Sequence, residues 1–208
     1  MKFYRFGGYS GIIFSPLLML ILGILGDDAS NDRVTNAAYL ADLGARSDTI
    51  QRIAGLGLLS LLFLLVHVEW LSDIVSQHSQ IWSRVARAGA LIAAMGIALS
   101  YGLTLIIGNF ATNEFQNEML RSTGLVAANL PAIFFIGMAV FAGAIATLGW
   151  RGRFPKWLTI LSTIEVVLVV VSTANGAPGG AALPTAIWII VNAIGLLLAN
   201  RKDLKKAS

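Results

Sequence analysis

Three polar side chains lie inside long runs of apolar residues and are the first candidates for chemistry. Glu165 occurs in LTILSTIEVVLVVVST, His67 in LLFLLVHVEWLSDIV and Asn192 in AIWIIVNAIGLLLAN. At a helical rise of about 1.5 Å per residue, each lies roughly 12 Å from the more basic end of its own apolar segment. A carboxylate beside an imidazole can pass a proton, because each group tunes the charge of the other. The sequence therefore predicts an intramembrane polar layer of Glu165, His67 and Asn192.

The same layer also has a purely structural interpretation. Ionisable residues inside membrane helices cost about 2.5 to 3.5 kcal/mol on insertion scales and usually mark a functional site. A neutral Glu165 that only hydrogen-bonds His67 or Asn192 would instead fix how the helices pack. Such bonds contribute about 0.6 kcal/mol on average. The sequence leaves both interpretations open.

Two acidic residues near the basic end of the same segment as His67 form a secondary set of candidates. Glu69 and Asp73 are four residues apart and therefore share one helix face. We expect them to pair with a basic residue near the helix ends, such as Arg84, Arg87 or Arg151. The pairing would be structural.

A looser polar set lies toward the opposite end of the molecule. It consists of Ser100, Tyr101, Thr104 and Asn129. These side chains can line an outward vestibule, and helix-backbone hydrogen bonding explains the Ser100 hydroxyl equally well.

The sequence contains none of the common catalytic or cofactor signatures. It has no Cys and only two His, His67 and His78, which excludes thiolate chemistry and a three-His zinc site. GxSxG, HExxH, P-loop and GxGxxG patterns are missing. We therefore expect no catalytic residue, no bound metal and no cofactor, and predict that the protein is not an enzyme.

The elements that must position these residues are long apolar helices. Of the 208 residues 56% are hydrophobic and 12% charged, against about 25% charged in soluble domains. Windows long enough to cross a hydrocarbon core of roughly 30 Å recur, and a β-barrel would instead show alternating residues. The sequence predicts one all-α domain, residues 1–208, that is a polytopic membrane bundle of six transmembrane helices. The expected spans are 7–26, 53–75, 86–108, 124–149, 157–174 and 182–199.

The distribution of charge predicts the orientation of the bundle. With a cytoplasmic N-terminus, 11 of the 15 basic residues fall on the inner side, as the positive-inside rule requires. Both termini are then cytoplasmic, and the expected location is the inner membrane of a bacterium. Because the charge gathers at helix ends, we expect lipid and no nucleic acid as a partner. A membrane protein partner and a homo-oligomer are left open.

Small residues and prolines indicate how the helices pack. We expect residues 86–108 to form the central packing helix, Ala139 and Gly143 to make a smaller contact surface, Pro131 to bend its helix, and Trp188 to pack inside. Between the first two spans, residues 34–43 are expected to form a short helix. The small residues of the central helix recur at spacings of three and four: Ala86, Gly89, Ala93, Gly96 and Ser100.

The last third of the chain resembles a broad group of uncharacterised bacterial six-helix membrane proteins. The similarity lies in GWRGRFPKWLTIL, with Pro155, Lys156, Trp157 and Leu158, and in PTAIWIIVNAIGLLLANRK, with Trp188, Arg201 and Lys202. The resemblance implies six helices in a bacterial membrane and no established activity. It assigns no role to Glu165.

Two functions are compatible with these features. The first is a non-enzymatic accessory or interaction protein of the bacterial cytoplasmic membrane. The alternative is a small-solute or proton-coupled transporter that uses the layer of Glu165, His67 and Asn192.

Overall fold

The computed structural model describes residues 2–26, 45–110, 122–124, 126–127 and 129–206 of the chain. Within these ranges the regular structure is helical, with no β-strand, as the composition predicts. The expected short helix at 34–43 lies outside the described residues. The elements are α1 (Lys2–Gly26), α4 (Ser47–Ser76), α5 (Gln80–Phe110), α7 (Pro131–Trp150), α8 (Lys156–Ala174), the 3-10 helix η2 (Pro178–Ala181) and α9 (Ala182–Lys206).

Five of the described helical segments are long and apolar enough to cross a membrane. They are Ser47–Ser76, Gln80–Asn109, Pro131–Trp150, Lys156–Ala174 and Gly179–Leu198. A sixth apolar stretch, Phe6–Ile21 in α1, is shorter. The prediction of a helical membrane bundle is therefore confirmed. The count of six spans stays a prediction.

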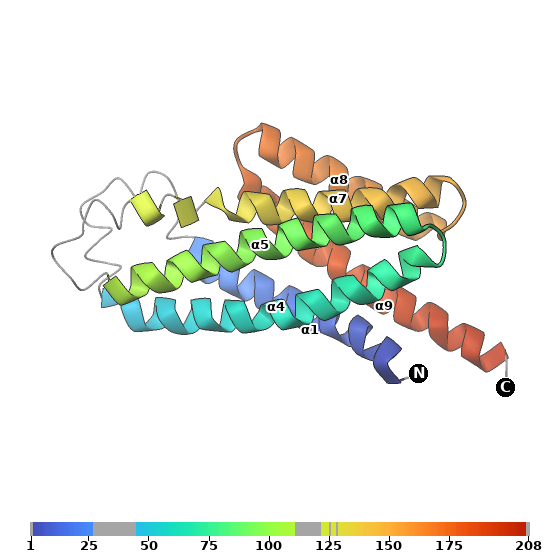
Figure 1. The fold of residues 1–208 in the computed structure, drawn as a ribbon, viewed down its shortest axis with the longest axis horizontal. Helices are drawn as coiled ribbons and strands as arrows, with labels where there is room; N and C mark the ends of the chain where they lie inside the picture. Colours follow the sequence, from blue (N-terminus) through green and yellow to red (C-terminus); the bar gives the residue numbers. More distant parts are fainter. Residues whose placement is uncertain (1, 27–44, 111–121, 125, 128, 207–208) are drawn as a thin grey trace.

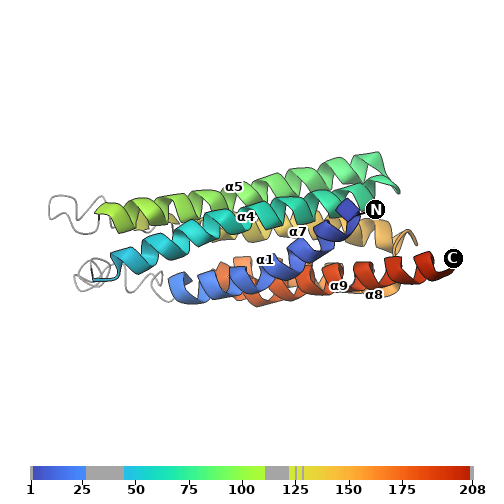
Figure 2. The same ribbon diagram turned by 90° about the horizontal axis from the view of Figure 1, so that it is seen from below.

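The helices pack against one another in chain order, and the last closes on the first. Helix α4 contacts α1 and α5, α7 contacts α5 and α8, and α9 contacts both α8 and α1. The α4–α5 and α7–α8 connections are short turns, which make the helices of each of these two pairs antiparallel. Both termini lie at the same end of the bundle as these two turns (Figures 1 and 2). We call this the turn end.

The closest helix pair, α5 and α7, meets through small residues. A Cβ added at Gly89 would lie 2.7 Å from the carbonyl oxygen of Gly137, and one at Gly96 would lie 2.8 Å from the backbone nitrogen of Phe134. The expected small-residue contact of Gly89 and Gly96 is confirmed. On α7, however, the close approach uses Gly137. A Cβ at Gly143 would meet only Val166 of α8, at an ordinary 3.8 Å, so Gly143 is not part of this close contact, whereas Ala139 is partly buried against the core.

Pro131 begins a helix instead of bending one. It stands in the first turn of α7, where its missing N–H has no partner to lose. The expectation of a bend inside a 124–149 helix was therefore wrong. Trp188, which we expected to pack inside, is buried, and its ring meets Phe141 edge-on with centroids 5.9 Å apart.

Candidate functional site

Glu165 lies on the one buried face of α8. That face recurs at spacings of three and four and consists of Leu158, Ser162, Glu165 and Val169, while most other α8 side chains are exposed. Only 2% of the Glu165 surface is accessible. The hydroxyl of Thr185 on α9 donates a hydrogen bond of 2.5 Å to Glu165 Oε1. Glu165 Oε2 is buried and has no hydrogen-bond partner among the described residues.

The facing surface of α9 carries polar residues at matching spacing. Thr185, Trp188 and Asn192 follow each other by three and four residues and so share one face. Trp188 Nε1 donates to Ser162 Oγ at 3.1 Å, one turn from the Glu165–Thr185 bond. The two hydrogen bonds form a ladder along the α8–α9 interface.

Asn192 continues this face of α9 toward the turn end of the bundle. Its side chain is fully buried, and neither Oδ1 nor Nδ2 has a hydrogen-bond partner. Thr185, the partner of Glu165, lies seven residues earlier, about 10 Å along the helix axis. Glu165 and Asn192 therefore face the same helix interface but lie about two turns apart in depth.

His67 lies between a different pair of helices. It is fully buried on α4, and its Nδ1 lies 3.0 Å from the carbonyl oxygen of Gly7 on α1. A carbonyl can only accept, so Nδ1 carries the proton and Nε2 of the neutral ring is an acceptor. Nε2 has no partner. The ring rests on Gly11, where an added Cβ would come within 2.5 Å of it.

The structure thus distributes the three candidates over two helix interfaces. Glu165 bonds Thr185 and His67 bonds Gly7, while the remaining polar atoms of the three side chains have no hydrogen-bond partner. No hydrogen bond therefore joins one candidate to another. Thr185 and Ser162 were missed by the sequence reasoning. Thr185 lies three residues before Trp188 and Ser162 lies three residues before Glu165, and this spacing was the signal that could have found them.

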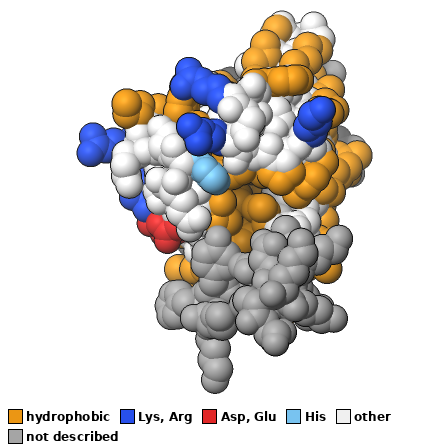
Figure 3. All heavy atoms as spheres, turned by 90° about the vertical axis from the view of Figure 1, so that its right-hand side faces the viewer, with side chains coloured by type: hydrophobic (Ala, Val, Ile, Leu, Met, Phe, Trp, Pro, Cys, Tyr) orange, Lys and Arg blue, Asp and Glu red, His pale blue; other side chains and the backbone are white. Residues whose placement is uncertain are grey.

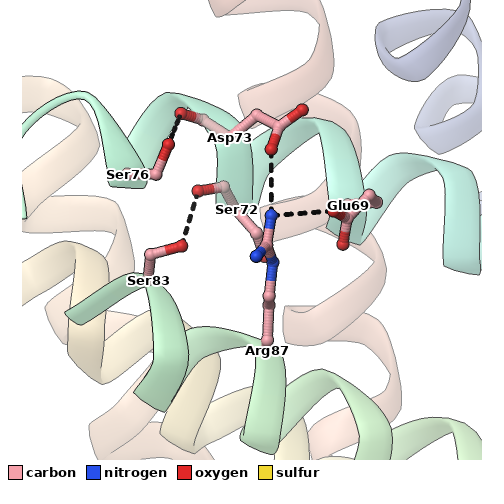
Figure 4. Close-up of polar contacts among 6 residues, drawn as sticks. All are labelled: Glu69, Ser72, Asp73, Ser76, Ser83 and Arg87. Carbon is pink, nitrogen blue, oxygen red and sulfur yellow. Dashed lines mark hydrogen bonds and ion pairs between the residues drawn. The ribbon is translucent and has the colours of Figure 1, made fainter. Parts of the chain in front are cut away.

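The secondary acidic set forms the expected ion pairs. Arg87 on α5 donates to Glu69 Oε1 at 2.8 Å and to Asp73 Oδ1 at 3.0 Å, both on α4 (Figure 4). Beside them, the hydroxyl of Ser83 donates to the Ser72 carbonyl at 3.0 Å. The prediction that Glu69 and Asp73 meet a basic residue such as Arg87 is confirmed. These contacts fix α4 against α5 near their connecting turn.

Replacing Arg87 with Gln should have only a small effect on folding. The side chains of Arg87, Glu69 and Asp73 are 44%, 60% and 59% exposed. Exposed ion pairs contribute about 1 kcal/mol or less to the free energy of unfolding. We expect the free energy of unfolding to fall by less than about 1 kcal/mol. Thermal unfolding in detergent, at low and high salt, measures this. A loss of several kcal/mol would contradict the structural role assigned here.

The outer polar residues differ in burial and in the contacts that the structure gives them. The hydroxyl of Ser100 donates to the Ala127 carbonyl at 3.0 Å, which accounts for it without a vestibule. Tyr101 is buried, its ring lies against Gly57, and its hydroxyl has no partner. Asn129 is exposed. Among the described residues, no group of three or more His, Cys, Asp or Glu side chains comes together as metal ligands would.

These features define the chain as a multi-pass helical membrane protein. One curated protein is similar to it, the Na(+)/H(+) antiporter NhaA of Gluconobacter oxydans (strain 621H), with 28% identity over 199 residues. The alignment covers 95% of this chain but only 41% of that protein, so the chain spans less than half of the relative's length. No family model matches the chain, and no solved structure is similar enough to count as a match.

Proposed function

We propose that this protein is a proton-coupled transporter of a small solute and that Glu165 takes up and releases the coupling proton. The observation that carries the proposal is the buried carboxyl group of Glu165 between α8 and α9. Its Oε1 accepts a hydrogen bond from Thr185, and its Oε2 has no hydrogen-bond partner among the described residues. An ionisable group in this position costs about 2.5 to 3.5 kcal/mol on insertion scales. The single bond from Thr185 offsets only part of that cost, since such bonds average about 0.6 kcal/mol. A residue kept at a net cost is typical of a transport pathway.

The similarity to a protein named as a Na(+)/H(+) antiporter supports a transport role and supplies the first solute to test. Carboxylate and hydroxyl oxygens are the ligands that hard cations prefer, and Glu165 and Thr185 place one of each side by side. We therefore propose Na⁺ as the first candidate solute. Because the chain aligns with 41% of the relative, no further property of that protein is transferred.

The test uses the full chain reconstituted into liposomes that enclose a pH-sensitive dye. We expect a pulse of external Na⁺ to change the internal pH only in vesicles that contain the protein. K⁺ and uncharged solutes are then added in the same way to define the solute class. If no solute moves protons beyond the rate of empty vesicles, the transport proposal is wrong.

The alternative role of a non-enzymatic accessory protein finds no support in the described helices or in the relative's name. We also propose that the chain has no enzymatic activity, because the sequence supplies none of the catalytic patterns considered above. We also propose that the chain is related to the uncharacterised bacterial six-helix membrane proteins. The residues that suggest it, Pro155 to Leu158, form the start of α8.

We further propose that the chain crosses the bacterial inner membrane six times, with α1 as the first span. The turn end would face the cytoplasm. The exposed basic residues of both turns support this orientation: Arg84, Arg87, Arg151, Arg153 and Lys156. All five lie at the turn end, together with both termini (Figure 1). Basic residues are retained on the cytoplasmic side of bacterial membrane proteins.

Single cysteines can test this orientation directly, because the chain has no Cys of its own. Gln77→Cys lies just after α4 at the turn end, and Asn175→Cys lies just after α8 at the opposite end. In intact cells we expect an impermeant maleimide to label Asn175→Cys and to label Gln77→Cys only after lysis. The reverse pattern would show the opposite orientation. Labelling of both would contradict the span count.

A further inference from the structure

At the turn end of the bundle, the described basic side chains outnumber the described acidic ones. Figure 3 looks onto this end and shows basic side chains across its described part, with acidic side chains at one edge. The described acidic side chains there, Glu69 and Asp73, are both bound by Arg87. Four exposed basic side chains remain, and none of them forms an ion pair with a described residue: Arg84, Arg151, Arg153 and Lys156.

Ring contacts hold the two turns of this end together. The guanidinium of Arg151, after α7, lies 5.9 Å from the ring centre of Trp82 on α5. Phe154, in the α7–α8 turn, meets His78, in the α4–α5 turn, edge-on with ring centres 4.9 Å apart. The cations from separate parts of the chain are therefore presented on one fixed surface.

Exposed indole rings flank the same cations. Trp150 is 69% exposed and its Nε1 donates to Thr163 at 3.1 Å, so the ring is oriented while its face stays accessible. Trp157 is 39% exposed, and its outer edge packs against Gly195. Arg151, Arg153 and Lys156 lie between these two residues in sequence. Indole rings settle at the headgroup level of a bilayer, where the phosphates are.

We propose that Trp150 to Trp157, with Trp82 and Arg84, form a binding site for the headgroups of anionic phospholipids such as phosphatidylglycerol. The cations would bind the phosphate, and the indole rings would contact the glycerol and the first methylene groups. A soluble phosphorylated partner would use the cations but would leave the exposed indoles without a role. This inference is independent of transport and of Glu165.

Lipid binding to the purified full chain tests the proposal, measured by native mass spectrometry from a neutral detergent. We expect phosphatidylglycerol to bind tighter than phosphatidylcholine. Arg151→Gln, Arg153→Gln and Lys156→Gln should each weaken phosphatidylglycerol binding about fivefold and leave phosphatidylcholine binding unchanged. All three residues are exposed, so the variants should fold, and the thermal midpoint in neutral detergent verifies this.

Arg52→Gln is the matched control, since Arg52 is an exposed arginine near the other end of α4. Its phosphatidylglycerol binding should equal that of the native chain. An equal loss in Arg52→Gln would show that only general charge is sensed. Equal binding of both lipids by the native chain would show that the site does not select an anionic headgroup. Competition by inorganic phosphate at concentrations similar to those of the lipid would assign the site to a soluble anion. Any of these three results would overturn the proposal.

Discussion

Gly137→Ala should strongly destabilise the bundle. The added Cβ would collide with the backbone nitrogen of Ala93 and lie 2.5 Å from the carbonyl oxygen of Gly89. Backbone atoms cannot rotate away as side chains can, so α5 and α7 would have to separate along their whole contact. We expect a loss of about 3 kcal/mol in the free energy of unfolding, the upper range for overpacked sites. Denaturant titration in detergent measures it.

Gly143→Ala is the matched control on the same helix. Its Cβ would meet only Val166 Cγ2 at 3.8 Å, which is ordinary contact. The variant should be as stable as the native chain, or slightly more stable, because alanine also favours the helix. If Gly137→Ala proved as stable as Gly143→Ala, the close α5–α7 contact described here would be wrong.

Glu165→Gln should abolish proton coupling while the fold persists. The amide has nearly the same shape and keeps an oxygen that can accept from Thr185, but it cannot exchange a proton at physiological pH. We expect solute-driven proton flux in liposomes to fall about a hundredfold, at the low end of the contribution of a positioned proton-transfer group. Glu69→Gln is the control, because Glu69 is exposed in its ion pair and should leave the flux unchanged.

The stability of Glu165→Gln distinguishes function from packing. If the carboxyl is retained for transport despite its cost, the variant should be as stable as the native chain or more stable. A variant that is less stable at every pH and keeps its proton flux would make Glu165 a packing residue. The thermal midpoint, measured from about pH 5 to 8, gives this comparison.

The sequence predicted the helical class well because apolar length is a strong signal. Five expected spans correspond to helices long enough to cross a membrane, and the small-residue spacing on α5 identified its contact surface. The sequence did not predict helix contacts that depend on the shape of the partner helix. Gly137 and Gly143 both look like packing glycines in sequence, and only the facing backbone of α5 distinguishes them.

The prediction that the three polar residues lie at one depth failed for a related reason. The depth of Asn192 was counted from an expected helix end near residue 199, but α9 continues to Lys206. The true register is set by side-chain contacts such as that of Trp188 with Ser162, which place Glu165 opposite Thr185. Counting from helix ends therefore could not show that Glu165 on α8 and Asn192 on α9 face the same helix interface at different depths.

The proposed transport role requires that Glu165 gain and lose a proton inside the bundle. The most direct measurement is the infrared difference spectrum of the protein in lipid between about pH 5 and 8, read at the C=O stretch of protonated carboxyl groups. We expect a band whose intensity changes with pH in the native chain and that is missing from Glu165→Gln. A pH-dependent band that persists in Glu165→Gln, or no pH-dependent band in the native chain, would contradict it.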